Sequence, residues 1–272
     1  MDGSPSSAKS DPVILVGVGF TTSRVARRLL ARGVETWAAV RNPDRFTELA
    51  SLGLKLNGDL PQGAILIHTV PPGAAGIRDI IEAAKPRSVV YISSTGVYGD
   101  QHHVDHTTPI APADDKGRAR VDEEQWVQTS GPWSSLIVRP AAIYGPGRGV
   151  HMRVLEGKLA RGSGAGVVSR IHVDDLAAIV EAGALSDLAG AWPVADERPC
   201  SSEEITQWCA NLLGIELTEA HTVPTWGRRV DGSAIREALG LRLLYPDYES
   251  GILASLSVVN GAVPRIEQSA DR

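Results

Sequence analysis

Short apolar segments alternate with segments of helical periodicity through the first half of the chain. The apolar segments are bounded by glycine, proline or charged residues and lie at residues 13–19, 35–41, 64–70 and 88–94. Helical segments separate them, at residues 23–33, 46–53 and 77–85. Apolar strands that alternate with helices are typical of a parallel sheet covered on both faces. The pattern therefore predicts a doubly wound α/β fold.

The pattern continues into the second half of the chain and then changes. Further elements are predicted as a helix at 121–130, a strand at 134–145, a strand at 170–173 and a helix at 174–185. After about residue 197, helices at 201–214 and 232–240 follow with few apolar strands. We therefore expect a main α/β domain over residues 12–196 and a smaller C-terminal domain over residues 197–272.

Two segments complete this division. Residues 1–11 are rich in serine and lack an apolar run, which predicts a disordered tail. Residues 146–166 are rich in glycine and charge, and we assign them to the smaller domain.

Composition narrows the classes of partner. The chain has 272 residues and is 43% hydrophobic, which is enough to bury a sizeable core. With 27 basic and 32 acidic residues its formal net charge is −5, and the one basic cluster, residues 24–32, is predicted to be the outer face of a helix. A nucleic-acid partner is therefore not expected.

Cysteine content and hydropathy indicate the compartment. Cys200 and Cys209 lack the spacing of a zinc site, and two such thiols suit a reducing environment. No apolar stretch approaches the ~20 residues that a membrane-spanning helix needs. We therefore expect a cytoplasmic protein without a membrane partner.

A glycine turn follows the first apolar segment. Gly17 permits a tight turn, and Gly19 allows a ligand to approach the backbone. Thr22 stands where a third glycine usually serves helix-to-strand packing; we expect it to widen that packing without blocking an anion site. The amides and hydroxyls around Phe20, Thr21 and Thr22 would then bind a diphosphate. A glycine-rich turn that binds nothing is the alternative, but its position after the first strand favours a dinucleotide.

Three more residues bear on the identity and the position of this dinucleotide. The second strand ends at Arg41 rather than at an acidic residue, and a cation there suits the 2′-phosphate of NADP, with NAD as the alternative. Asp59 follows the third strand and could reach the adenine amino group, although it could equally form a turn. Pro71 follows the fourth strand and is expected beside the cofactor.

Four segments carry a family resemblance: YISSTGVYGD at 91–100, the stretch from Pro112 to Glu124, LIVRPAAIYGPGR at 136–148, and RIHVDDLA at 170–177. Together they resemble the extended short-chain dehydrogenase/reductase superfamily, the NAD-dependent epimerase/dehydratase group. The resemblance spans residues 12 to about 255 and is specific for the superfamily but not for a substrate. It implies a Rossmann dinucleotide-binding domain over residues 12–196 and a substrate-binding cap after it.

The resemblance also implies catalytic positions. The catalytic hydroxyl of the family falls on Ser94, whereas its Tyr-x-x-x-Lys motif falls on Lys116 and Arg120, so the usual tyrosine is absent. Arg120 would hold the nicotinamide ribose. Lys116 would transfer the proton if repulsion by Arg120 and partial burial lowered its pKa; a solvated lysine is the alternative. Tyr98 could substitute as the proton donor, or it could be structural.

The remaining candidates border the expected substrate cleft and are Thr95, Arg139, Tyr144, Arg148, Arg170 and His172. Thr95 stands where sugar-nucleotide dehydratases of the family carry an acidic residue, which disfavours elimination chemistry. Arg139 could instead anchor a strand end by pairing with a carboxylate. His172 could be structural, ahead of a helix for which Asp174 is the expected N-cap.

Residues 100–106, DQHHVDH, invite a metal site, but they lack the helical spacing of a preformed one, and no metal is expected. The first functional hypothesis is an NADP-dependent oxidoreductase or epimerase-like enzyme acting on a small hydroxyl- or carbonyl-bearing substrate. The alternative is a non-catalytic NADP-binding sensor or regulatory protein. The oligomeric state stays open, with a homodimer as one candidate.

Overall fold

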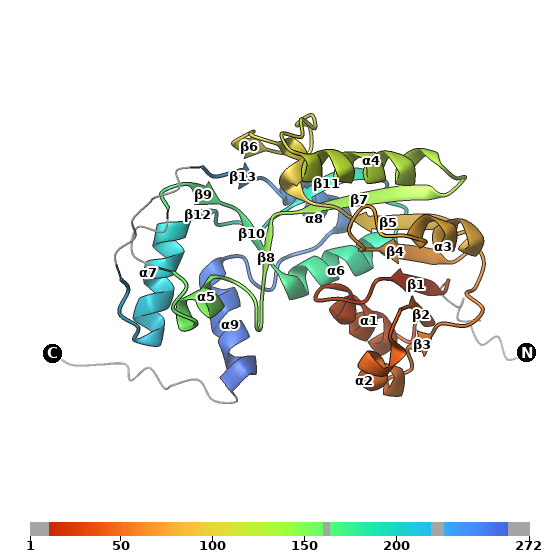
Figure 1. Cartoon of the computed structure of the whole chain (residues 1–272), viewed down its shortest axis with the longest axis horizontal. Helices are drawn as coiled ribbons and strands as arrows, with labels where there is room; N and C mark the ends of the chain where they lie inside the picture. The colour runs from red at the N-terminus through yellow and green to blue at the C-terminus, as the bar shows by residue number, and fades with distance from the viewer. Residues whose placement is uncertain (1–10, 160–163, 219–225, 261–272) are drawn as a thin grey trace, which may run out of the picture.

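The computed structural model describes residues 11–159, 164–218 and 226–260. The tail predicted at residues 1–11 therefore lies outside the described residues except for Asp11, which is exposed and pairs with Arg87 at 2.6 Å. Figure 1 shows a central sheet flanked by helices, with a smaller group of helices beside it. Within the described residues, no helix is both long enough and apolar enough to cross a membrane.

A seven-stranded parallel sheet forms the centre of the molecule, in the order β11-β7-β5-β4-β1-β2-β3. Its strands are β1 (Val13–Val16), β2 (Thr36–Ala39), β3 (Lys55–Leu56), β4 (Ile65–His68), β5 (Ser88–Ile92), β7 (Ser134–Pro140) and β11 (Gly190–Val194). The strand order reverses between β1 and β4. In open α/β sheets, ligands bind outside the carboxyl ends of the strands at such a point. The doubly wound fold predicted from the apolar pattern is confirmed.

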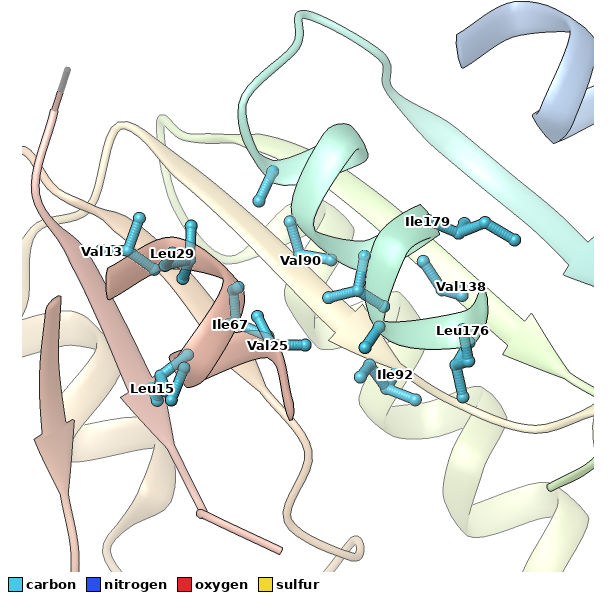
Figure 2. Close-up of a cluster of buried hydrophobic side chains, with 14 of the residues drawn as sticks. Val13, Leu15, Val25, Leu29, Ile67, Val90, Ile92, Val138, Leu176 and Ile179 are labelled. Carbon is cyan, nitrogen blue, oxygen red and sulfur yellow. The ribbon is translucent and has the colours of Figure 1, made fainter. Parts of the chain in front are cut away.

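Helices cover both faces of this sheet. On one face, α1 (Thr22–Ala31) packs against α6 (Val173–Ala184). Figure 2 shows the apolar side chains of this layer, among them Val25, Leu29, Leu176 and Ile179 of the helices and Leu15, Ile67 and Val90 of the strands. On the other face, α3 (Ile77–Ala84) and α4 (Asp115–Thr129) contribute Ile81 and Val127. Burial of each such side chain contributes about 1.5–3 kcal/mol, so the two layers hold the sheet.

The strand predicted at 134–145 is two strands. β7 ends at Pro140, and β8 (Ala142–Tyr144) leaves the main sheet to pair with β10 (Arg170–His172). The chain turns at Ala141, whose amide donates to the carbonyl of Val194 in β11. β11 itself has no counterpart among the predicted strands. It contains Pro193, which a sheet tolerates here because β11 is an edge strand.

A second, smaller core holds the cap. It joins α5 (Val150–Leu155), α7 (Ser202–Leu213) and α9 (Tyr248–Asn260) through Val154, Ile205, Cys209 and Ile252. The short strands β9 (Val167–Val168) and β12 (Cys200–Ser201) pair beside it. The described part of 146–166 includes α5, which packs on α7 within this core.

One segment departs from the expected division at residue 197. α8 (Ser233–Leu239) returns to the main domain, where Ile235 is fully buried in the core formed by α1, α6 and the sheet. The C-terminal segment is therefore shared between the two cores. The remaining short elements are α2 (Thr47–Ser51), β6 (His103–Val104), β13 (Arg229–Val230) and two 3-10 turns at Pro43–Phe46 and Thr95–Tyr98.

A buried threonine holds the turn between β1 and α1. Gly17 has a φ of +86°, and a Cβ there would lie 2.7 Å from Cγ2 of Val70, so the position requires glycine. The Thr22 hydroxyl donates to the carbonyl of Gly17 at 2.8 Å and accepts from the amide of Gly19 at 2.8 Å. With 1% of its surface exposed, Thr22 fills the inside of the turn. The expected widening is not needed, because the helix still buries Val25 completely.

Replacement of Thr22 by valine should lower the free energy of unfolding by about 1–2 kcal/mol, because it leaves the Gly19 amide without its partner. Thr22→Ser keeps the hydroxyl and should cost less. Urea denaturation of the three proteins measures the difference. Equal stability of Thr22→Val and the wild type would show that these two hydrogen bonds do not hold the turn.

A buried carboxyl group lies where the sheet meets the cap. Asp196 follows β11, is 3% exposed, and donates its amide to the carbonyl of Arg170 at 2.6 Å. Burial raises the pKa of Asp196 to about 8, against the opposing charge of Arg170. Between an unfolded pKa of about 3.9 and the folded value, the folded state therefore binds more protons than the unfolded state. The free energy of unfolding therefore falls as pH rises through this window, because Asp196 ionises in the unfolded state while burial keeps it protonated in the folded state.

We expect Asp196→Asn to be more stable than the wild type at pH 8.5, by on the order of 2 kcal/mol, because asparagine stays neutral. The gain should shrink steadily toward pH 4, where the native carboxyl is protonated in the folded state and half-protonated in the unfolded one. Chemical denaturation of both proteins across this range tests the expectation. A difference in stability that does not vary with pH would contradict it.

Candidate active site

The amino end of α1 forms an opening for an anion. Phe20 and Thr21 precede the helix, and the first amides of a helix have no partners within it and carry its positive dipole end. A Cβ on Gly19 would meet no atom within 4 Å, so space beside this residue is open. The structure thus brings the predicted turn residues together. It corrects the expectation for Thr22, whose hydroxyl is already bonded inside the turn and supports it rather than facing a ligand.

Two charged residues follow the neighbouring strands at the same edge. Arg41 lies just after β2 and Asp59 just after β3, and both are exposed. Neither has an ion-pair partner among the described residues. Pro71 follows β4 at this edge and lines a cavity of about 400 Å³ with Arg78 and Glu123. These positions are compatible with the adenosine end of a dinucleotide that lies across the strand order reversal.

Ser94 lies just beyond the carboxyl end of β5. Its side chain is half-buried, and its Oγ accepts a hydrogen bond from the amide of Gly96 at 3.1 Å. The first turn of α4 packs directly on this segment, because a Cβ on Gly117 would lie only 3.0 Å from the carbonyl oxygen of Gly96. Asp114 caps the same turn by accepting from the Gly117 amide at 2.7 Å. Local packing therefore sets the start of α4 against the Ser94 turn.

Lys116 and Arg120 occupy successive turns of α4 but lie in different surroundings. Lys116 is exposed, so the partial burial on which its expected role depended is absent. Arg120 is half-buried and lies beside the hydroxyl of Tyr91 in β5. Burial raises the pKa of Tyr91 to about 12, against the opposing charge of Arg120. α4 itself, from Asp115 to Thr129, contains no tyrosine.

Tyr98 and Arg139 are structural, which corrects two predicted roles. Arg139 is 8% exposed and pairs with Glu124 of α4, with 2.7 Å between Nη2 and Oε2. Its Nη1 donates to the hydroxyl of Tyr98 at 3.0 Å, and Tyr98 is fully buried. A buried guanidinium must be paired, and this pairing leaves neither side chain facing a cleft. The carboxylate anchor weighed for Arg139 is the arrangement found.

His172 and Arg170 are likewise engaged within the fold. Nδ1 of His172 accepts from the amide of Asp174, so His172 rather than Asp174 is the N-cap of α6. Its Nε2 lies 3.2 Å from the Ser255 hydroxyl, and burial lowers its pKa below the usual range. Arg170 is 6% exposed and donates to the carbonyl groups of Val168 and Cys200. These two side chains join the main domain to the cap.

A cavity of about 410 Å³ lies between β8 and the cap helices. Tyr144, Arg148 and Arg170 line it, together with apolar residues that include Met152, Ile205 and Ile252. The Tyr144 hydroxyl donates to the carbonyl of Asp247 at 3.1 Å, and burial raises the pKa of Tyr144 far above its usual value. Tyr144 is therefore a neutral wall of this cavity, and its hydroxyl hydrogen is already engaged by the Asp247 carbonyl.

Arg228 is a buried residue that the sequence did not reveal. Its guanidinium donates to the carbonyl groups of Thr95, Gly99 and Gln101, the loop that follows Ser94. Burial lowers the pKa of Arg228. Thr95, expected at the substrate, thus takes part in this contact through its carbonyl group. Residues 227–230, GRRV, have the polar composition of a surface segment. Nothing in this local sequence indicates that three carbonyl groups from a distant loop surround the Arg228 side chain.

The histidine-rich segment does not converge. His102 lies 2.8 Å from the carbonyl oxygen of Gly227, whereas His106 stacks on Trp192 with ring centroids 6.0 Å apart. Asp105 accepts instead from Thr107 and Thr108. Across residues 11–159, 164–218 and 226–260, no group of three or more metal-ligating side chains is placed to hold an ion.

Comparison with known proteins identifies relatives over nearly the whole chain. Residues 68–185, from β4 to the end of α6, match the NAD-dependent epimerase/dehydratase family. Protein YeeZ of Escherichia coli strain K12 is 27% identical over 273 residues, a match that covers 86% of this chain and 96% of YeeZ. A functionally unknown conserved protein from Silicibacter pomeroyi, with a solved structure, is 31% identical with a TM-score of 0.79; the match covers 92% of this chain and 99% of that one.

The architecture is shared with a better-known structure. UDP-glucose 4-epimerase from Thermus thermophilus, solved in complex with NAD, matches with a TM-score of 0.74 over 93% of this chain and 100% of that one. At 19% identity this likeness shows the fold alone. The family match covers the chain from the end of β4 to the end of α6, whereas the glycine turn and most of the cap lie outside it. Residues 68–185 identify a domain of the NAD-dependent epimerase/dehydratase family in this chain, which supports a nicotinamide cofactor.

Proposed function

We propose that this protein is an NADP-dependent oxidoreductase or epimerase-like enzyme that acts on a small hydroxyl- or carbonyl-bearing substrate. The observation that carries the proposal is the placement of the open glycine turn and of Ser94 at the same edge of the sheet. Among the described residues, the Phe20 and Thr21 amides of the turn have no hydrogen-bond partner and could bind a diphosphate, and Ser94 supplies a hydroxyl two strands away. When bound, the nicotinamide would supply hydride exchange with the substrate.

The residues present fit such a cofactor. Open space at Gly19 allows the diphosphate to approach the Phe20 and Thr21 amides. The adenosine would then extend over the ends of β2 and β3, where Arg41 is an exposed cation without an ion-pair partner in the described chain. Because no acidic residue stands at this strand end to hold a free 2′-hydroxyl, Arg41 favours a 2′-phosphate and thus NADP over NAD.

Ser94 would orient the reacting oxygen of the substrate. Its Oγ already accepts from the Gly96 amide, so its own hydrogen is free to donate to a carbonyl oxygen. Lys116 would donate a proton to that oxygen, because it lies on the helical turn that packs against the Ser94 segment; donation by an ammonium group does not require the partial burial that the structure lacks. Arg120, one turn further along α4, would face the ribose from its position beside Tyr91.

A non-catalytic binding protein is the weaker reading. The family match includes epimerases and dehydratases by its description, and the Thermus thermophilus relative is named as an epimerase. The Ser94 hydroxyl also keeps a donor free at the sheet edge, which a cofactor-binding sensor does not require. The enzyme and the non-catalytic binding protein differ in whether bound NADPH is oxidised by a carbonyl substrate.

Arg41→Gln should weaken the binding of NADPH about tenfold and leave the binding of NADH unchanged, because only NADPH carries the 2′-phosphate. Tryptophan fluorescence during titration with each cofactor gives both affinities. Arg87 precedes β5, at the amino ends of the strands and thus away from the proposed cofactor site. Arg87→Gln is therefore the matched control and should bind both cofactors as the wild type does. A wild type that prefers NADH, or an Arg41→Gln variant that loses both cofactors equally, would refute the assignment of NADP.

Lys116→Met should slow the oxidation of NADPH by a panel of small aldehydes and ketones about a hundredfold, with the affinity for NADPH unchanged. The loss is expected because methionine fills the same space without a transferable proton. Arg118→Met removes a neighbouring exposed cation of α4 and serves as the control. Turnover that survives Lys116→Met would assign the proton to another group, and a wild type that binds NADPH but oxidises it with no carbonyl compound would favour the sensor.

A further inference from the structure

Arg148 reaches the nucleotide turn from a segment more than a hundred residues away in sequence. Its guanidinium carbon lies 5.3 Å from the ring centroid of Phe20. Phe20 directly precedes the open amino end of α1, whereas Arg148 follows β8 and leads into the cap. In Figure 1 the lower end of β8 lies across from the start of α1. A cation from the cap side therefore stands beside the proposed diphosphate site.

A tight turn fixes this position. The amides and carbonyl groups of Gly145 and Arg148 exchange hydrogen bonds of 2.9 and 3.0 Å. The turn packs so closely that a Cβ on Gly145 would lie 2.5 Å from Cγ1 of Val173 and 3.3 Å from the Phe20 ring. The backbone that carries Arg148 is thus held against both the nucleotide turn and the start of α6.

The two arginines at the Phe20 ring differ in their partners. Arg24, 4.5 Å from the ring centroid, is neutralised by Asp174 at 2.7 Å and also donates to the carbonyl of Phe20. Arg148 is exposed, and no ion pair or side-chain hydrogen bond engages its guanidinium within the described part of the chain. Contact with an aromatic ring positions a guanidinium but does not neutralise it. Arg148 therefore retains its full capacity to bind an anion.

We propose that Arg148 binds the diphosphate of the dinucleotide, so that the segment leading into the cap contributes a fixed cation to the cofactor site. Guanidinium groups bind phosphate oxygens through paired, charge-assisted hydrogen bonds. The helix amides would hold the diphosphate from one side and Arg148 from the other. This inference rests on the proposed cofactor site, and it differs from the expectation that Arg148 contacts the substrate.

Arg148 also lines the 410 Å³ cavity. The alternative is therefore that Arg148 binds an anionic group, such as a phosphate, of a substrate in that cavity. Ligands that carry different parts of the cofactor separate the two. ADP-ribose contains the diphosphate without a 2′-phosphate or a nicotinamide, and adenosine 2′-monophosphate contains the 2′-phosphate without a diphosphate. Only the first of these should depend on Arg148.

The experiment is calorimetric titration of the full chain and of Arg148→Gln with NADPH, ADP-ribose and adenosine 2′-monophosphate. We expect Arg148→Gln to weaken NADPH and ADP-ribose about tenfold and to leave adenosine 2′-monophosphate unchanged. Arg27→Gln is the matched control, because Arg27 is an exposed arginine of α1 that pairs with Glu48 away from the Phe20 ring. Thermal melting confirms that both variants fold.

Unchanged binding of ADP-ribose by Arg148→Gln would overturn the inference and assign the residue to the cavity. An equal loss for all three ligands, or an equal loss in Arg27→Gln, would also overturn it, because it would show a general effect of positive charge. Failure of the wild type to bind NADPH and ADP-ribose would instead refute the proposed function itself. The two failures are therefore distinguishable.

Discussion

The turn between β1 and α1 depends on one buried hydroxyl group. Thr22 lies between the carbonyl of Gly17 and the amide of Gly19, and its two hydrogen bonds close the turn from within. A third glycine would leave that space to packing alone. The Thr22 hydroxyl bonds inward, and within the described residues no hydrogen bond engages the Phe20 and Thr21 amides at the start of α1. The replacement of the usual glycine thus reinforces the turn at which we propose that the cofactor diphosphate binds.

Buried charges fix the opposite wall of the site. Arg139 is paired with Glu124 and Tyr98 beneath the Ser94 strand, and Arg228 binds three carbonyl groups of the loop that follows Ser94. Each guanidinium has lost its water and must recover its hydrogen bonds within the protein. Because the loop carbonyl groups satisfy Arg228, the loop takes one position relative to β5. These charges act on the backbone and on Tyr98, and they leave the side chains of Ser94 and Lys116 available for the proposed substrate.

The sequence predicted those features that depend on local pattern. Apolar periodicity was sufficient for the doubly wound sheet, and the glycine spacing located the turn at Gly17 and Gly19. Prediction from the sequence failed where contacts between residues far apart in the chain determine the structure. The sequence allowed Arg139 to be either a substrate ligand or a structural anchor, and only its contact with Glu124 of α4 decides between them. Similarly, nothing in the local sequence distinguishes the buried Arg228 from its exposed neighbour Arg229. Likewise α8 returns to the main core because Ile235 finds a buried position there, which a change in composition near residue 197 could not indicate.

The central claim is that the amino end of α1 holds the diphosphate of the cofactor while Thr22 keeps the turn closed. A crystal structure of the protein grown with NADPH tests it most directly. The account predicts diphosphate oxygens within hydrogen-bond distance of the Phe20 and Thr21 amides, with the Thr22 hydroxyl still bonded to Gly17 and Gly19. A diphosphate bound elsewhere, or a Thr22 side chain turned outward into that position, would contradict it.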